Sequence, residues 1–119
     1  MVNSIRREEL ERALKEGEVL ALEALPPEYF EAGHLPGARN LPLDKLEDLA
    51  HDLIPSLDQP VVTYCSNTAC NNSAAAAERL VRLGYRNVRK FPGGKEEWSE
   101  AGLPLESGGE QEAGARTRR

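Results

Sequence analysis

The chain has 119 residues, a length that suits one domain, and its formal net charge of −5 argues against a general nucleic-acid binder, which needs a basic face. No apolar run approaches the length that spans a membrane, and residues 1–16 are charged and patterned like a helix, unlike a signal peptide. We therefore expect a cytoplasmic protein with no nucleic-acid or membrane partner. Two cysteines in a reducing compartment are better suited to chemistry than to a structural disulfide.

The first half of the chain predicts helices that alternate with short extended segments. A helix is expected over residues 4–16, with Ser4 as its N-cap and Gly17 at its end. The next segment, 18–25, is largely apolar with little alternation, as in a buried parallel strand. The remaining predictions for this half are a helical turn at 28–32, a Gly/Pro-rich connector at 34–42 with an extended piece at 38–41, and a helix at 43–54.

The second half continues the alternation of strands and helices. It predicts a central strand at 61–64, a helix at 73–83, a short strand at 87–90, a turn at 92–94 and a helix at 95–101. This order suits right-handed crossovers and implies a parallel sheet with helices on both faces.

The end of the chain differs in composition from the rest. Residues 107–119 contain no Leu, Ile, Val or aromatic residue, so this segment cannot contribute to a core. We predict one domain over residues 1–106 and a disordered tail over 107–119.

The first cysteine stands at the most informative place in the predicted sheet. Cys65 directly follows the central strand, and ligands of open parallel sheets bind beyond the carboxyl ends of their strands. A short polar loop separates it from the helix that begins near Ser73. The N-terminus of a helix has unpaired N–H groups that favour an anion, so this position is expected to lower the pKa of the thiol and yield a nucleophilic thiolate.

Three separated segments of the sequence resemble motifs of rhodanese-like domains. Residues 30–42, FEAGHLPGARNLP, are similar to the GHIPGA-type segment of that family. Residues 64–77 resemble its active-site cysteine loop and the helix that follows. Residues 83–104 contain LGYRNV, PGG and WSEAGLP, similar to its C-terminal signature. Together the motifs cover roughly residues 18–105 in the order of the family, which makes the resemblance specific.

The resemblance implies both a fold and an activity. The fold is a three-layer α/β/α rhodanese-like domain with a central, mostly parallel sheet. The activity is that of a single-domain sulfurtransferase, whose cysteine attacks the outer sulfur of a donor, becomes a persulfide and passes the sulfur to a thiol or cyanide. The partners implied are a small sulfur donor or the persulfide of a partner protein, and a thiol acceptor. We expect neither a metal nor an organic cofactor.

The same resemblance assigns roles around the cysteine loop. Cys65 occupies the catalytic position of the family and is the expected sulfur acceptor. Cys70 is a candidate second or resolving thiol, with a small residue packed under the loop as the alternative, and the two thiols could close into a disulfide under oxidation. The loop has no positive charge, which argues against efficient use of thiosulfate. Its expected substrate-binding residues are Ser66, Asn67, Thr68, Ala69, Asn71, Asn72 and Ser73.

Two further polar residues are candidate modulators of the site. Many family members have Asp-x-Arg before the GHIPGA-type segment, and the matching positions here are Glu23 and Leu25. Glu23 either faces the loop and influences thiol ionisation or is a solvated carboxylate at the end of a strand. His34 is expected to fix its turn by hydrogen bonds to the backbone. A zinc site is disfavoured because the spacing of the His and Cys residues fits no compact zinc module.

Other functions remain as alternatives to sulfur transfer. A cysteine phosphatase needs an Arg six residues after its nucleophile, where this chain has Asn71 after Cys65 and Ala76 after Cys70. Arsenate reduction is harder to exclude because it can use paired thiols. The remaining alternative is a non-catalytic, partner-dependent or redox-sensing rhodanese-like module that carries sulfur. A thioredoxin-like oxidoreductase is disfavoured by the Cys-x4-Cys spacing.

Overall fold

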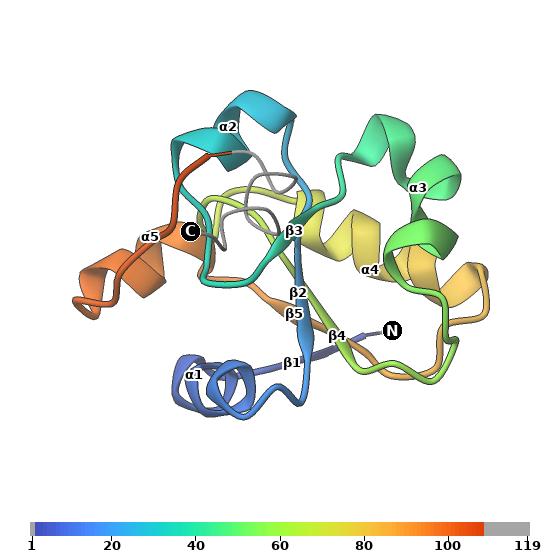
Figure 1. The fold of residues 1–119 in the computed structure, drawn as a ribbon, viewed down its shortest axis with the longest axis horizontal. Coiled ribbons are helices and arrows are strands. Elements are labelled where there is room, and N and C mark those ends of the chain that lie inside the picture. The colour runs from blue at the N-terminus through green and yellow to red at the C-terminus, as the bar shows by residue number, and fades with distance from the viewer. Residues whose placement is uncertain (1, 109–119) are drawn as a thin grey trace, which may run out of the picture.

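The centre of the molecule is a parallel sheet of five strands (Figure 1), and the computed structural model describes residues 2–108. The order across the sheet is β1-β5-β4-β2-β3, and every pairing is parallel. The predicted α/β class with a central parallel sheet is therefore confirmed. The strands are β1 Asn3–Ser4, β2 Leu20–Glu23, β3 Arg39–Asn40, β4 Val61–Tyr64 and β5 Val88–Phe91.

Helices cover both faces of the sheet, which gives the three predicted layers. Figure 1 shows α1 and α5 on one side, and α3 and α4 on the other. The side chains of β4 alternate between these layers, because Val61 packs with residues of α3 and α4 whereas Val62 packs with residues of α1 and α5. The helices are α1 Arg7–Lys15, α2 Pro27–Ala32, α3 Leu46–Leu53, α4 Asn72–Arg82 and α5 Gly94–Glu100, with a short 3₁₀ helix, η1, at Leu43–Lys45.

The start of the chain differs from the prediction. Ser4 is not the N-cap of a helix, because it belongs to β1 and is paired with Lys90 of β5. The next residue, Ile5, continues this ladder by donating its N–H to the Lys90 carbonyl at 2.9 Å, and its side chain is buried in the core. Burial of Ile5 thus keeps this segment extended, and α1 begins only at Arg7.

Two aromatic side chains contribute to one of the two core clusters. Phe30 and Trp98 both lie in the core cluster on the α1 and α5 side of the sheet. Of the predicted tail, only residues 107 and 108 belong to the part of the chain that the structure describes, and the prediction for 109–119 lies outside it. Within the described residues, no helix is long and apolar enough to cross a bilayer.

Candidate active site

Cys65 lies at the carboxyl end of the innermost strand of the sheet. β4 is hydrogen-bonded to β2 on one side and to β5 on the other, so the residue that follows it is enclosed on both sides. Cys65 itself is 0% exposed. The N–H and hydroxyl of Ser73, in the first turn of α4, both interact with its thiol. The predicted arrangement of a strand-end thiol facing a helix N-terminus is thus present.

The loop after Cys65 is held in shape by its own polar groups. Cys70 donates its N–H to the Asn67 carbonyl at 3.1 Å, and Ala69 donates its N–H to the Asn67 side-chain oxygen at 3.0 Å. These bonds form a turn that brings Cys70 back over Cys65. The Cys65 thiol donates to the Cys70 carbonyl with an Sγ to oxygen distance of 3.5 Å.

The far end of the loop is tied to the sheet at the start of α4. The Asn72 side chain donates to the Ala24 carbonyl, just beyond β2, at 2.8 Å. The Thr63 hydroxyl, on β4, donates to the Ser73 carbonyl at the same distance. Two polar side chains therefore fix where α4 begins relative to the strand that carries Cys65.

A third anchor comes from the first turn of α5. Lys95 and Glu96 donate their backbone N–H groups to the carbonyls of Cys65 and Ser66, at 3.0 and 2.9 Å. This close approach depends on Gly94, which has a φ of +60° and on which a Cβ atom would lie 2.3 Å from the Cys65 oxygen. The Gly-Gly turn of the C-terminal motif thus has a physical role, which is to bring the start of α5 against the cysteine loop.

The pKa values of the two thiols are shifted in opposite directions. Burial, together with the neighbouring Cys70, raises the pKa of the Cys65 thiol, and the Ser73 hydrogen bonds only partly offset this. Partial burial also disfavours the Cys70 thiolate, but hydrogen bonds from the Cys65 thiol and from backbone groups of Asn72 and Ser66 outweigh it. The pKa of the Cys70 thiol is therefore lowered.

This result corrects the expectation for Cys65. The helix N-terminus was expected to lower its pKa, yet complete burial and a second thiol in contact have the larger effect. Of the two thiols, Cys70 is therefore the one that ionises more readily.

The predicted loop residues differ in how close they come to the thiols. Ser66, Asn72 and Ser73 interact with one of the two sulfur atoms. Asn67 shapes the turn, and Asn71 stands at the N-cap position of α4 without a capping bond from its side chain. Thr68 and Ala69 lie exposed at the tip of the loop. Their predicted role in binding substrate stays a prediction.

A buried ion pair lies beside the cysteine loop. Glu23, 0% exposed at the end of β2, accepts hydrogen bonds from the Tyr64 hydroxyl at 2.8 Å and from Lys95 Nζ at 3.0 Å. Burial raises the pKa of the Glu23 carboxyl, while its bonds to Lys95 and Tyr64 oppose this rise. Burial, and then the charge of Glu23, raises the pKa of the Tyr64 hydroxyl, so that hydroxyl remains a donor.

The solvated alternative for Glu23 is therefore wrong. Its carboxylate accepts hydrogen bonds from Tyr64, which precedes Cys65, and from Lys95. Glu23 therefore helps to hold in place the residues that position the cysteine loop. Sequence reasoning missed Lys95, whose ammonium group also donates to the Tyr29 and Gly33 carbonyls at 3.0 and 2.7 Å. The sequence did contain a signal for such a partner, namely Glu23 at the end of an apolar strand, because a buried carboxylate needs a cation.

His34 has the structural role that was expected. Its Nδ1 lies 2.7 Å from the Phe30 carbonyl, and because a carbonyl only accepts, this nitrogen carries the proton. The ring stacks on the Phe30 ring with centroids 3.8 Å apart. His34 thus fixes the turn after α2, and it also acts to lower the pKa of the Glu23 carboxyl. Its role as a modulator of the thiols stays a prediction.

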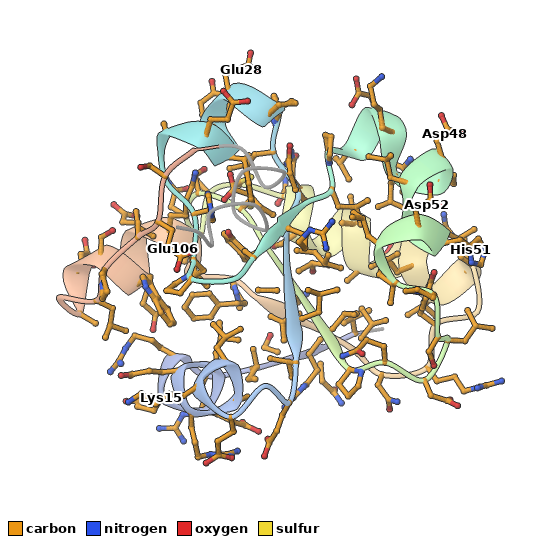
Figure 2. All side chains as sticks on the ribbon, in the orientation of Figure 1. Lys15, Glu28, Asp48, His51, Asp52 and Glu106 are labelled. Carbon is orange, nitrogen blue, oxygen red and sulfur yellow. The ribbon has the colours of Figure 1, made fainter. Side chains whose placement is uncertain are left out.

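The other histidine is remote from the site. Figure 2 shows His51 on the outer side of α3 beside Asp48 and Asp52, and all three are exposed. Among the residues that the structure describes, no group of three or more His, Cys, Asp or Glu side chains is placed to hold a metal ion.

Comparison with known proteins identifies the family. Residues 6–101 match the Rhodanese-like domain family, and the chain belongs to it. It is 38% identical over 106 residues to the HTH-type transcriptional regulator Rv0324 of Mycobacterium tuberculosis, a match that covers 89% of this chain and 46% of the regulator. The chain spans about half the length of the curated relatives it matches, since it also covers 54% of the uncharacterized protein YqhL of Bacillus subtilis.

Solved structures show the same fold. A rhodanese-related protein from Thermoplasma volcanium superposes with a TM-score of 0.75 at 28% identity, covering 87% of this chain and 97% of that one. The human single-domain sulfurtransferase TSTD1 superposes with a TM-score of 0.72 at 24% identity, covering 84% of this chain and 97% of that one. Membership of the family supports a role of the sulfur-transfer type.

Proposed function

We propose that this protein is a sulfurtransferase that carries sulfane sulfur on Cys65 as a persulfide. The observation that carries the proposal is the position of Cys65, buried at the end of β4 with the N–H and hydroxyl of Ser73 directed at its sulfur. A persulfide anion formed there would be stabilised by the first turn of α4 and by the N–H groups of the loop.

The reaction begins with a proton transfer within the thiol pair. The Cys70 thiol ionises more readily than the Cys65 thiol, and the Cys65 thiol proton is directed at the Cys70 carbonyl. Movement of that proton onto Cys70 produces the Cys65 thiolate, so Cys70 serves as the base for the buried nucleophile. The Cys65 thiolate attacks the outer sulfur of the donor, and the remainder of the donor leaves with the electron pair of the broken bond.

The second half of the reaction regenerates the thiolate. A thiol acceptor, deprotonated, attacks the outer sulfur of the persulfide, and Cys65 leaves with the electrons of its sulfur–sulfur bond. No atom is lost from the protein in this cycle. The acceptor gains one sulfur atom and becomes a persulfide.

The loop favours donors that need no cationic clamp. Residues 66–73 contain no Lys or Arg, and the ammonium group of nearby Lys95 is already paired with Glu23. A doubly charged thiosulfate would therefore be held only by N–H groups and hydroxyls. We propose a polysulfide or the persulfide of a partner protein as the donor class.

A steady-state assay tests this proposal. Purified protein is given thiosulfate, a polysulfide or 3-mercaptopyruvate with a thiol acceptor, and persulfide or sulfide production is followed over time. Polysulfide is expected to give the highest rate, and Cys65→Ser to remove activity with every donor. The matched control Ser99→Ala, on the exposed side of α5, is expected to leave the rate unchanged. Equal activity of Cys65→Ser and wild type would overturn the proposal.

A second candidate is a sulfur-carrying or redox-sensing module that depends on a protein partner. The match to a protein named as a transcriptional regulator, of which this chain covers 46%, favours it. This candidate predicts that Cys65 accepts sulfur only from a protein persulfide. Loading by small donors alone would exclude it.

A further inference from the structure

The second cysteine lies where it can react with whatever the first one carries. The turn stabilised by Asn67 places Cys70 over Cys65, with the Cys65 sulfur 3.5 Å from the Cys70 carbonyl. The two thiols also affect each other's pKa, as expected for side chains that lie close together. Both cysteines are free in this structure, one buried and the other half-exposed.

Only one of the two cysteines is fixed by the sheet. Cys65 continues a strand that is paired on both edges, and its carbonyl is fixed by the Lys95 N–H. Cys70 belongs to a loop without regular secondary structure, held by the turn at Asn67. A small movement of Cys70 toward Cys65 therefore requires no change in the sheet.

From this geometry we infer that Cys70 resolves the Cys65 persulfide, releasing hydrogen sulfide and closing a Cys65–Cys70 disulfide. The inference rests on the proposed function, because it needs sulfur on Cys65. It adds an activity to that function, namely the reduction of sulfane sulfur to sulfide by a dithiol within the loop.

The step balances as a thiol–disulfide exchange. The Cys70 thiol, which took the Cys65 proton, passes that proton to the outer sulfur of the persulfide anion, and the resulting Cys70 thiolate attacks the inner sulfur. A bond forms between the two cysteine sulfurs, and hydrosulfide leaves with the electron pair of the broken bond. The sulfane sulfur is reduced to sulfide, and the two cysteines are oxidised. An external thiol reductant, such as dithiothreitol in the assay, returns the disulfide to two thiols.

The alternative attack, on the outer sulfur, is disfavoured by the leaving group. It would expel the Cys65 thiolate, whose formation is opposed by complete burial. Attack on the inner sulfur expels hydrosulfide, a weaker base than a buried thiolate, and the group of lower pKa leaves faster. The lowered pKa of Cys70 supplies the attacking thiolate.

The test is a single turnover without oxygen or reductant. Reduced protein is loaded with a polysulfide and desalted, and the released sulfide, free thiols and intact mass are then measured over time. Wild type is expected to release one sulfide per chain and to end as a disulfide, with no free thiol and no added sulfur. Cys70→Ser, which lacks the proposed base and is therefore loaded for longer, is expected to keep one extra sulfur on Cys65. It is expected to release sulfide at about one tenth of the wild-type rate or less.

Two controls separate the outcomes. Val81→Ser, an exposed position on α4, is expected to behave as wild type, and Cys65→Ser is expected to take up no sulfur. Wild type that loads sulfur but keeps both the sulfur and the Cys70 thiol would overturn this inference alone. Failure of wild type to load from a polysulfide or a protein persulfide would overturn the proposed function and this inference with it.

An independent measurement tests the pair without any sulfur donor. Titration of reduced wild type with a mild oxidant is expected to join the cysteines within one chain, shown by the loss of two hydrogen atoms and by a peptide linking Cys65 to Cys70. Disulfides formed only between chains would contradict the inferred geometry.

Discussion

At the scale of single residues, the site depends on two neighbouring thiols whose pKa values are shifted in opposite directions. Cys65 is fully buried, whereas Cys70 is half-exposed and receives hydrogen bonds. The position of Cys65 was predictable, because a strand that ends on a cysteine before a helix is visible in the sequence. The direction of its pKa was not, because burial and contact with the second thiol depend on the fold of the loop.

The opposite pKa shifts of the two thiols predict the order in which they react. At a pH below about 8.5, the ordinary pKa of a free cysteine, iodoacetamide is expected to modify Cys70 before Cys65. Peptide mapping of partly alkylated protein measures this order. Replacement of Cys65 by Ala removes a hydrogen-bond donor, so the midpoint of Cys70 alkylation is expected to move to higher pH. Faster modification of Cys65 in the native protein would contradict the assignment.

At the scale of elements, the loop is defined by the two helices that meet it. α4 directs Ser73 at the Cys65 sulfur, and the first turn of α5 donates N–H groups to the Cys65 and Ser66 carbonyls. Both helices were predicted to within a residue at either end. The contact between the first turn of α5 and the cysteine loop was not predicted, since it joins segments far apart in the chain.

Ser73→Ala tests the contribution of α4. Its hydroxyl lowers the pKa of Cys65, so its removal is expected to raise that pKa further. Sulfur uptake increases with pH as the nucleophile ionises, so the midpoint of the rate profile should move to higher pH. At neutral pH uptake is expected to fall by about tenfold, and the rates should converge at high pH. Ser99→Ala is the control. An unchanged pH–rate profile for Ser73→Ala would show that the Ser73 hydroxyl does not assist the ionisation of Cys65.

Gly94→Ala tests the contact with α5. A Cβ atom there would lie 2.3 Å from the Cys65 oxygen, and its φ of +60° adds backbone strain. The expected loss in the free energy of unfolding is about 2 kcal/mol or more, with slower sulfur uptake. Gly17→Ala is a matched control, because φ there is +71° and a Cβ would meet nothing within 4 Å. Equal losses for the two variants in urea unfolding would show that the contact is unimportant.

At the scale of the whole molecule, a buried ion pair connects the elements around the site. Lys95 of α5 joins Glu23 of β2 to the carbonyls of Tyr29 and Gly33, in and after α2. The fold class followed from the sequence because apolar strands alternate with helical periodicity. The ion pair and β1 could not be predicted from the sequence, since each depends on a partner more than 70 positions away.

Lys95→Met leaves Glu23 buried without its cation. The expected loss in the free energy of unfolding at neutral pH is about 3 kcal/mol. Without Lys95, the pKa of Glu23 should rise further in the folded state, so folding then retains a proton that the unfolded chain releases. The loss should therefore be small below the ordinary pKa of 4.5 and grow as pH rises above it.

Urea unfolding of wild type and variant at several pH values measures this difference. The double variant Glu23→Gln with Lys95→Met has no buried charge at this position, so its loss relative to wild type is expected to depend much less on pH. A loss for Lys95→Met that is equal at acid and neutral pH would contradict the account of the pair.

The measurement that tests the central claim most directly is intact mass after exposure to a polysulfide. Cys70→Ser keeps the proposed carrier without the proposed resolving thiol, and it is expected to gain one sulfur atom that peptide mapping places on Cys65. Cys65→Ser is expected to gain none under the same conditions. A sulfur atom retained on Cys70 in Cys65→Ser, with none on Cys65 in Cys70→Ser, would contradict the account.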